Sequence, residues 1–289
     1  AQAYLAVAAD AEGLRLSRDT FEAQQAMLGL IQKSRDLGVA SDLDLSQSQS
    51  QVEAARADVA RYTALLAVDQ NALAVLVGAP VGAELLPEGL SAVSAPRAVH
   101  SGLSSDVLLR RPDILAAEHQ LRAANASIGA ARAAFFPRIS LTAGAGSVSS
   151  ELSALLGAGT GTWSFAPQIV APLFTGGANL ARLEASKLDR DIAVANYERA
   201  IQRAFAEVQN ALTLQTTLVE QRAAEEALVE ALDKTYRLSD ARFKAGLDSY
   251  LGVLVAQRSL FAAQQSLVAV RLAEQANRVT LYKVLGGGA

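Results

Sequence analysis

Residues 139–148 read ISLTAGAGSV, and residues 162–169 read TWSFAPQI. In both stretches apolar side chains alternate with polar or small ones, and residues two apart in a strand share a face. The apolar sets are Ile139, Leu141, Ala143 and Ala145 in the first stretch and Trp163, Phe165 and Ile169 in the second. Strands of about ten residues with one apolar and one polar face are typical of a membrane β-barrel hairpin. A soluble hairpin packed on a helix would alternate in the same way.

Long alanine-rich segments with helical patterning surround the two predicted strands. We expect helices over residues 1–36, 43–77, 111–136, 178–238 and 250–285. The fourth, with roughly 60 residues at about 1.5 Å each, would be some 90 Å long, far beyond an ordinary globular helix. In the last one, apolar residues recur at intervals of seven, which is typical of coiled-coil packing; the polar residues Gln264, Arg271 and Arg278 interrupt this seam.

Composition excludes several classes of function. Of 289 residues, 51% are hydrophobic and only 5% aromatic, which favours thin, closely packed helices over a wide globular core. The net charge of −3 and the lack of basic clusters argue against nucleic-acid binding. There is no cysteine, and His100 and His119 are the two histidines, so we expect no metal site and no cofactor. No nucleophile–base set or phosphate loop is evident, and we predict that the protein is not an enzyme.

The sequence also bears on how the chain could enter a membrane. No run of eighteen apolar residues occurs, because the longest candidate, Ala72–Leu86, contains Gly78, Pro80, Gly82 and Glu84. A transmembrane helix is therefore not expected, and membrane entry would require β-structure. The first eleven residues lack the basic region of a signal peptide and resemble the middle of a helix, from which we expect that the chain is truncated at its N-terminus.

The first and last helical hairpins match at a constant offset of 208 residues. Gly38 and Gly78 correspond to Gly246 and Gly286, and Ser41 corresponds to Ser249. Further identities link residues 43, 49, 54, 55 and 73 to their counterparts at the same offset. This agreement predicts two internal structural repeats. If so, a strand pair should also accompany the first hairpin.

Three motifs resemble sequences of the TolC-type outer-membrane efflux proteins. The nearest branch of that family is the OprM/NodT-like outer-membrane factor lipoproteins. The motifs are LRRPDI at 109–114, AANASIG at 123–129 and AARAAFFPRISL at 130–141. Trp163, Pro172, Phe174 and the Gly176-Gly177 pair match the second strand and the return to helix, and AQRSLF at 256–261 matches the periplasmic tip. The resemblance covers the whole chain. The chain departs from the family in lacking the first strand pair, the signal peptide and the acylated cysteine.

The resemblance implies a mainly α fold with a small β part: antiparallel coiled-coil hairpins that form an α-barrel, and a transmembrane β-barrel hairpin. In such a homotrimer each protomer gives four strands to one twelve-stranded barrel. We assign 1–78 to the first periplasmic hairpin, 79–111 to an irregular equatorial connector and 112–136 to a helix leading to the barrel. Residues 137–175 would be the outer-membrane strand pair with its external loop, and 178–285 the second long hairpin.

Candidate functional residues follow from the same resemblance. Asp42, Asp44 and Asp248 lie in the predicted periplasmic tips, where threefold symmetry would make each a ring of carboxylates that favours cations. The plain alternative is helix capping by Ser41 or Asp42, with acids favourable in the first turn. Contact with an adaptor is expected at the tip residues Gly38, Ser41, Gly246 and Ser249. Lipid contact is expected for Ile139, Leu141, Trp163 and Phe165.

The implied function is a passive exit duct of a tripartite efflux pump of the resistance–nodulation–division type, for drugs or other small molecules. It would lie in the outer membrane of a Gram-negative bacterium and extend into the periplasm, with outer-membrane lipid around it. Its partners would be a periplasmic adaptor protein and an inner-membrane transporter. Two alternatives stay open: the exit duct of a protein-secretion system, and a soluble periplasmic coiled-coil scaffold or adaptor.

Overall fold

The computed structural model describes residues 1–93 and 109–287, and the chain is mainly helical with one small sheet. The elements are α1 (Gln2–Asp36), α2 (Asp42–Val77), η1 (Ala83–Leu85), η2 (Leu90–Ala92), α3 (Pro112–Ala133), β1 (Arg138–Ser147), η4 (Leu152–Ala154), β2 (Gly161–Val170), α4 (Ala178–Lys244) and α5 (Tyr250–Val284). Two compact units divide the chain. One comprises Ala1–Ser104 with Ala206–Ala289, and the other Ser105–Phe205, so that α4 runs through both.

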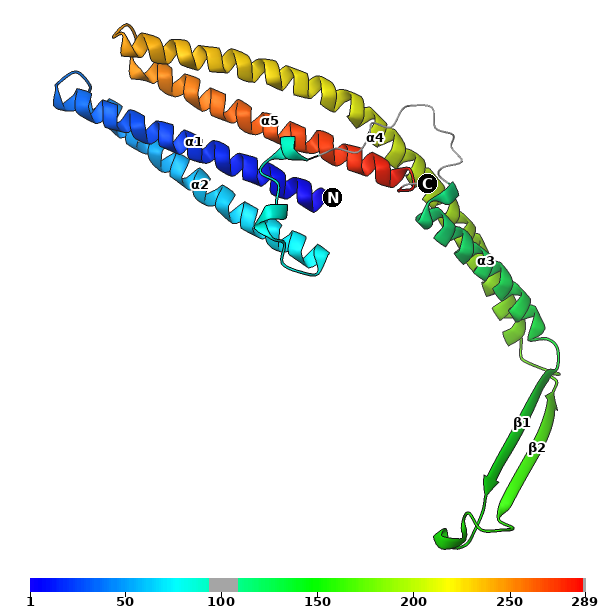
Figure 1. Ribbon diagram of the computed structural model, residues 1–289. Helices are drawn as coiled ribbons and strands as arrows, with labels where there is room; N and C mark the ends of the chain where they lie inside the picture. The colour runs from blue at the N-terminus through cyan, green and yellow to red at the C-terminus, as the bar shows by residue number, and fades with distance from the viewer. Residues whose placement is uncertain (94–108, 288–289) are drawn as a thin grey trace. The chain divides into compact units, whose positions relative to one another are not determined.

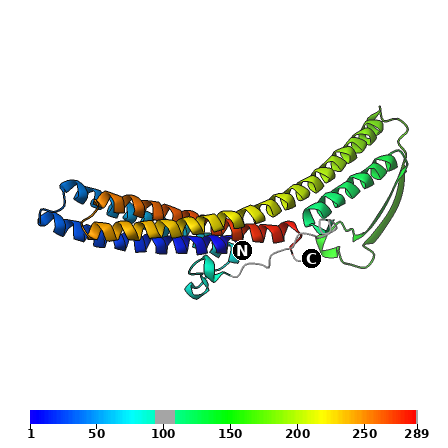
Figure 2. The ribbon, with the colours of Figure 1, turned by 90° about the horizontal axis from the view of Figure 1, so that it is seen from above.

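The first unit consists of two helical hairpins that lie side by side (Figures 1 and 2). One is α1 with α2, and the other is the second part of α4 with α5; α1 packs against α5. The buried apolar residues of this unit form several small clusters along the contacts between helices, and not one wide core. Near the start of α1, for example, Leu5, Ala8 and Ala9 pack with Leu90 of η2. The buried positions on α5 include Val253, Leu260, Leu267 and Leu281, which belong to the seven-residue pattern.

The α1–α2 hairpin depends on one very close approach. Gly13 on α1 is buried, and a Cβ atom built there would lie 2.5 Å from Cε1 of Tyr62 on α2. The guanidinium of Arg61 covers the Tyr62 ring at 4.5 Å from its centroid. A missing side chain on one helix therefore makes room for an aromatic ring on the next.

The second unit contains α3, the strand pair and the first part of α4. β1 and β2 pair antiparallel as a two-stranded sheet, with Arg138 opposite Val170 at one end and Ser147 opposite Gly161 at the other. The end of α3 is tied to the start of α4 because the side-chain amide of Asn179 donates to the carbonyl of Ala134 at 3.0 Å. At the other end of α3, the largely buried Arg111 forms a bidentate pair with Asp113 at 3.0 and 2.7 Å.

Element ends differ from the sequence-based prediction by more than one residue in two places. α3 ends at Ala133 and not at Phe136, because the residue before Pro137 is pushed out of the helical region. α4 continues to Lys244 and not to Leu238, because nothing before Gly246 interrupts it. The predicted connector at 79–111 falls partly on residues 94–108, which include His100 and lie outside the described residues.

Within the described parts of the chain, one helix, α5, is long and apolar enough on average to cross a membrane, by length and composition only. Its buried side chains, however, pack inside the helical unit, with Val253 and Leu254 against Ile31 of α1. The apolar character of α5 is therefore accounted for by the core of a helical bundle.

Replacing Gly13 by alanine should displace the Tyr62 ring and weaken the α1–α2 hairpin. Overpacking of this kind costs about 1–3 kcal/mol. Gly29, on the same helix but with nothing within 4 Å of its virtual Cβ, is the matched control. There the same change should stabilise the helix by about 1 kcal/mol. Thermal unfolding followed by helical circular dichroism separates the two, and equal effects of both substitutions would contradict the packing argument.

Candidate functional site

The two hairpin turns have the same backbone geometry. Gly38 and Gly246 adopt φ values of 75° and 73°, which an L-residue with a side chain rarely adopts. The amide of Gly38 donates to the Arg35 carbonyl, and that of Gly246 to the Phe243 carbonyl, both at 2.8 Å. The following residue bonds one position further back in each turn, Val39 to Ser34 and Leu247 to Arg242. Each of these hydrogen bonds in the first turn thus has a counterpart in the second turn, between residues numbered 208 higher.

The helices that follow the two turns begin differently. Ser41 is the N-cap of α2: its hydroxyl accepts from the Asp44 amide at 3.1 Å, while the Asp44 carboxylate accepts from the Ser41 amide at 3.0 Å. This reciprocal capping box satisfies two backbone donors at once. Ser249 is the N-cap of α5 but makes no side-chain cap bond, and Gly252 stands where α2 has Asp44. Only the first turn therefore carries a side-chain cap, and the predicted capping role of Ser41 is confirmed.

The other two tip acids are held by local ion pairs. Asp42, whose side chain is 82% exposed, lies 3.0 Å from Nε of Arg35. Asp248 accepts from Arg242 at 2.5 and 3.1 Å, and this guanidinium holds the pKa of Asp248 below its usual range. Asp42 and Asp248 are therefore both held at the turns by arginines from the preceding helices.

The structure gathers part of the predicted tip set around one cavity. The cavity has a volume of about 560 Å³ and opens between the two turns. Asp44, Gly246, Asp248 and Ser249 line it, whereas Gly38, Ser41 and Asp42 do not. Below it lies an apolar cluster of all four helices, in which Ile31, Tyr250, Val253 and Leu254 are buried. Burial raises the pKa of Tyr250, and its ring lies 5.6 Å from that of Phe243.

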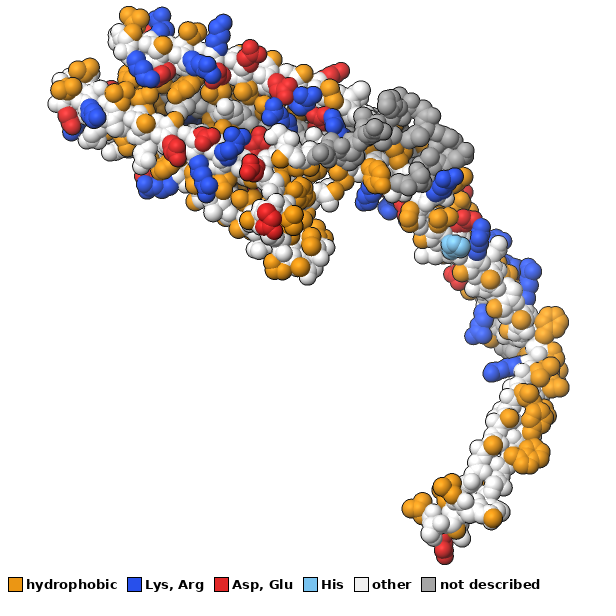
Figure 3. All heavy atoms as spheres, in the orientation of Figure 1, with side chains coloured by type: hydrophobic (Ala, Val, Ile, Leu, Met, Phe, Trp, Pro, Cys, Tyr) orange, Lys and Arg blue, Asp and Glu red, His pale blue; other side chains and the backbone are white. Residues whose placement is uncertain are grey.

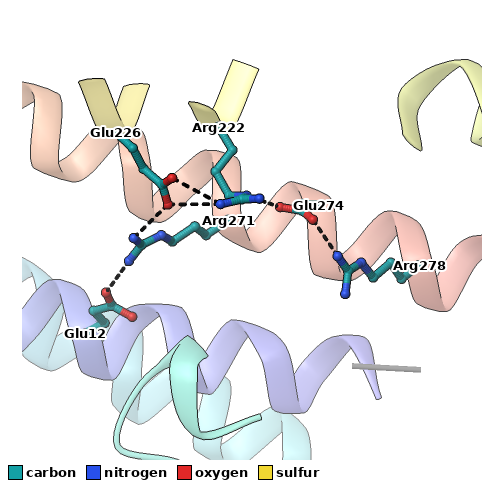
Figure 4. Close-up of polar contacts among 6 residues, drawn as sticks. All are labelled: Glu12, Arg222, Glu226, Arg271, Glu274 and Arg278. Atoms are coloured by element: carbon teal, nitrogen blue, oxygen red, sulfur yellow. Dashed lines mark hydrogen bonds and ion pairs between the residues drawn. The ribbon is translucent and has the colours of Figure 1, made fainter. Parts of the chain in front are cut away.

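A second polar feature, not predicted from the sequence, lies along the helical unit away from the tips (Figure 4). Six charged side chains from three helices form one network: Glu12 of α1, Arg222 and Glu226 of α4, and Arg271, Glu274 and Arg278 of α5. Glu274 is only 6% exposed and accepts from Arg222 at 2.8 Å and from Arg278 at 2.7 Å. Arg271 joins Glu226 at 3.1 Å and Glu12 at 3.8 Å, which connects the two hairpins.

This network is neutral as a whole, with three positive and three negative groups. Hydrogen bonds from Arg271 and Arg222 hold the pKa of Glu226 below its usual range. Glu12 also accepts from the amide of Leu90 at 3.1 Å, so that η2 is tied to the same point. The six side chains of the network pair with one another, which indicates that the network has a structural role in holding the two hairpins together. Its sequence signal was the pair of arginines, Arg271 and Arg278, that interrupt the seven-residue pattern of α5.

One acidic pair is placed unfavourably. Asp10 of α1 faces Asp69 of α2 and shares a hydrogen bond with it. Partial burial, and then the neighbouring carboxylate, raise the pKa of Asp10 to about 6, against the opposing effect of Arg61.

Across the described residues, no three histidine, cysteine or acidic side chains lie close enough to hold a metal ion.

The strand pair separates its side chains by chemistry. Cross-strand partners share a face, and Ile139, Leu141, Ala143 and Ala145 lie opposite Ile169, Pro167, Phe165 and Trp163. The other face carries the pairs Ser140–Gln168, Thr142–Ala166, Gly144–Ser164 and Gly146–Thr162. The side chains predicted to contact lipid are all well exposed, from 57% for Phe165 to 82% for Trp163. A continuous apolar face is thus open to the surroundings.

Comparisons with known proteins agree with this architecture. The profile of the family described as "Outer membrane efflux protein" matches residues 103–287. The chain is 47% identical over its whole length to the probable efflux pump outer membrane protein TtgC of Pseudomonas putida, and 41% identical over 95% of its length to the cation efflux system protein CusC of Escherichia coli. It spans 60% of the length of each. The open-state MtrE outer membrane channel of Neisseria gonorrhoeae superposes with a TM-score of 0.75, at 37% identity, covering 98% of this chain and 66% of that one.

Replacing Asp10 by asparagine should remove a pH-dependent loss of stability. The pKa of about 6 in the folded state exceeds the ordinary value of 3.8, so the folded state binds this proton more tightly. The contribution of Asp10 to the free energy of unfolding therefore falls as pH rises from about 4 to about 6 and stays low above that range. The variant should melt above the wild type at pH about 7.5, with the gain vanishing near pH 4. The exposed Asp19 on the same helix is the control, and a gain that does not change with pH would contradict the assignment.

Proposed function

Because this chain belongs to the outer membrane efflux protein family, we propose that it forms part of an outer-membrane exit duct of a tripartite efflux pump. The observation that carries this proposal is the two-faced strand pair, whose large apolar side chains are all well exposed. A membrane barrel needs strands of this kind, apolar toward lipid and polar toward the lumen. Long helical hairpins on the same chain would supply the periplasmic part of the duct.

The assembly that follows is a homotrimer. Three copies of one strand pair give six strands, fewer than the eight of the smallest outer-membrane barrels. The matching turns at an offset of 208 residues support an internal duplication, in which the full-length gene product contributes a second strand pair per protomer. Four strands from each of three protomers would then close a barrel of twelve, with the helical hairpins forming an α-barrel below it.

The duct is passive. Energy would come from an inner-membrane transporter of the resistance–nodulation–division type, coupled through a periplasmic adaptor. The adaptor would contact the exposed turns that contain Gly38, Ser41, Gly246 and Ser249. The exported compounds would be drugs or other small molecules. The relatives' names are consistent with this: one names an efflux pump without a substrate, and another names a cation efflux system.

Passage would be controlled at the tips. Under threefold symmetry Asp42, Asp44 and Asp248 each become a ring of three carboxylates, which favours cations. Local bonds fix the positions of these acids: Arg35 and Arg242 hold Asp42 and Asp248 at the turns, and the capping box holds Asp44. The second tip helix carries Gly252 at the position of Asp44, so the gate relies more on the first hairpin.

The assembly is tested by electron imaging of the full-length gene product. The protein should require detergent for extraction from the outer membrane and should appear as threefold tubes longer than about 100 Å, given the helix lengths. Monomeric rods recovered without detergent would contradict the proposal and favour a soluble coiled-coil scaffold.

Neutralising the first tip should change ion passage. In the Asp42→Asn, Asp44→Asn double variant, asparagine keeps an oxygen that can accept from the Ser41 amide, so that charge is lost with little change to the cap. Planar-bilayer recordings should show a weaker preference for cations or easier opening. Ser41→Ala is the control because it removes the cap hydroxyl and leaves both charges. Unchanged conductance and selectivity in the double variant would exclude the carboxylate gate.

A further inference from the structure

The polar face of the strand pair carries one charged side chain. In β1 and β2 together, Arg138 is the one charged residue. It lies opposite Val170, on the face that also carries Ser140 and Gln168. In Figure 3 large apolar side chains gather along one side of the strands, and the other side is mostly white. The charge of Arg138 therefore lies on the face opposite the apolar one.

The polar face is hollowed where α3 ends and the strands begin. A groove of about 680 Å³ opens there, lined by Phe136, Arg138, Ser140, Gln168, Val170 and Pro172 among others. Ser140 is the one residue of either strand that is partly buried, and every other strand position is exposed. The junction between α3 and the strands therefore shields this part of the polar face from solvent.

Three hydrogen-bond donors of different kinds line this groove. Arg138 contributes a guanidinium, Ser140 a hydroxyl and Gln168 a side-chain amide. Ser140 and Gln168 are cross-strand partners, whose Cβ atoms are typically about 5 Å apart. Arg138 is diagonal to Gln168 across the pair, a separation of about 7–8 Å that a long side chain can bridge. The three groups can therefore donate to one acceptor.

These donors have no competing partner. Within the described residues, the side chains of Arg138, Ser140 and Gln168 make no ion pair or hydrogen bond, and no acidic residue lines the groove. Arg132 and Arg182 are close in sequence, but they belong to α3 and α4 and do not line it. What distinguishes Arg138 from the arginines of the helices is its place in a groove beside two neutral donors.

The rest of the groove is apolar. Phe136 is 69% exposed and Val170 is 53% exposed, and Pro172 lies beside them in the lining. An apolar ligand body would remove these surfaces from water. The planar guanidinium fork, in turn, matches the two oxygens of a carboxylate. This combination suits a molecule with one carboxylate and an apolar body.

We propose that the groove binds small organic carboxylates with an apolar body as they pass through the duct. Arg138 pairs with the carboxylate, Ser140 and Gln168 donate to it, and Phe136 and Val170 contact the apolar body. This inference rests on the proposed function, because the polar face of the strands would then line the lumen. It names amphipathic carboxylates as a class of exported compound.

The acidic tips are compatible with this class. Asp42 and Asp248 each pair with an arginine at the turn, which reduces the repulsion that an entering carboxylate meets. A preference of the tips for cations would slow the entry of an anion and would not prevent it.

Binding is measured on the full-length gene product in detergent, with naphthoate as a fluorescent carboxylate whose anisotropy rises when it binds. Naphthylmethanol has the same apolar body without the charge and is the matched ligand. The variant Arg138→Gln removes the guanidinium. Its control, Arg132→Gln, removes the same charge from the last turn of α3, outside the groove. Gln168→Leu removes the amide and leaves every charge in place.

We expect Arg138→Gln to weaken naphthoate binding by about tenfold, because a charge-assisted hydrogen bond is lost. Binding of naphthylmethanol should stay unchanged in this variant. Gln168→Leu should weaken naphthoate binding by about threefold, the effect of one neutral hydrogen bond. Arg138→Lys should restore only part of the affinity, since lysine has the charge without the planar fork. Arg132→Gln should bind naphthoate as the wild type does.

Three results would overturn the inference. Equal losses in Arg138→Gln and Arg132→Gln would reduce the effect to general charge. Equal binding of naphthoate and naphthylmethanol by the wild type would show that the carboxylate is not recognised. Displacement of naphthoate by an equal concentration of inorganic phosphate would show that the groove holds any anion.

Planar-bilayer recordings separate failure of the groove from failure of the duct. Trimeric channels of ordinary conductance without preferential naphthoate binding would refute the groove and leave the proposed function standing. Naphthoate binding by a protein that forms no channel would contradict the duct, and the assignment of carboxylates as exported compounds would fall with it.

Discussion

The rest of the structure depends on one constraint: a two-stranded sheet with an entirely apolar face cannot remain exposed to water. An isolated strand pair is marginal at best, and the outer backbone groups of β1 and β2 need partners. In a bilayer such groups must be satisfied by neighbouring strands, which closed barrels provide. In the duct that we propose, lipid would cover the exposed face from Ile139 to Trp163, and further strand pairs would supply the missing backbone partners.

The long helices are subject to a different requirement: the helical part must stay thin over a long distance. Alanine-rich sequences bring backbones close together, but they leave little apolar surface for a core. The two hairpins are held together by small clusters and by polar contacts between them. Among these contacts, the buried carboxylate of Glu274 depends most on its partners, the two arginines Arg222 and Arg278. Loss of one partner from a buried pair costs about 3–5 kcal/mol, so this network would be intolerant of substitution.

Much of this organisation follows from local sequence patterns. Period-two alternation predicts both strands and the residues on each face, and the register pairs the two apolar sets as one surface. The turn glycines and Ser41 predict where α1 ends and α2 begins. What could not be predicted depends on contacts between distant segments. Asp10 approaches Asp69 only when α1 packs against α2, and Glu12 approaches Arg271 only when the two hairpins pack together. The exposure of Phe136 depends on how the chain turns before Pro137.

The most direct test of the two-faced strand pair uses the absence of cysteine from this chain. Single cysteines at Leu141, Thr142, Ser164 and Phe165 of the full-length gene product would be treated, in outer membranes, with a charged thiol reagent that cannot enter lipid. Leu141 and Phe165 share the apolar face, whereas Thr142 and Ser164 share the other. The account predicts labelling at positions 142 and 164 and protection at 141 and 165. Equal labelling of neighbouring positions would show that neither face meets lipid and would contradict it.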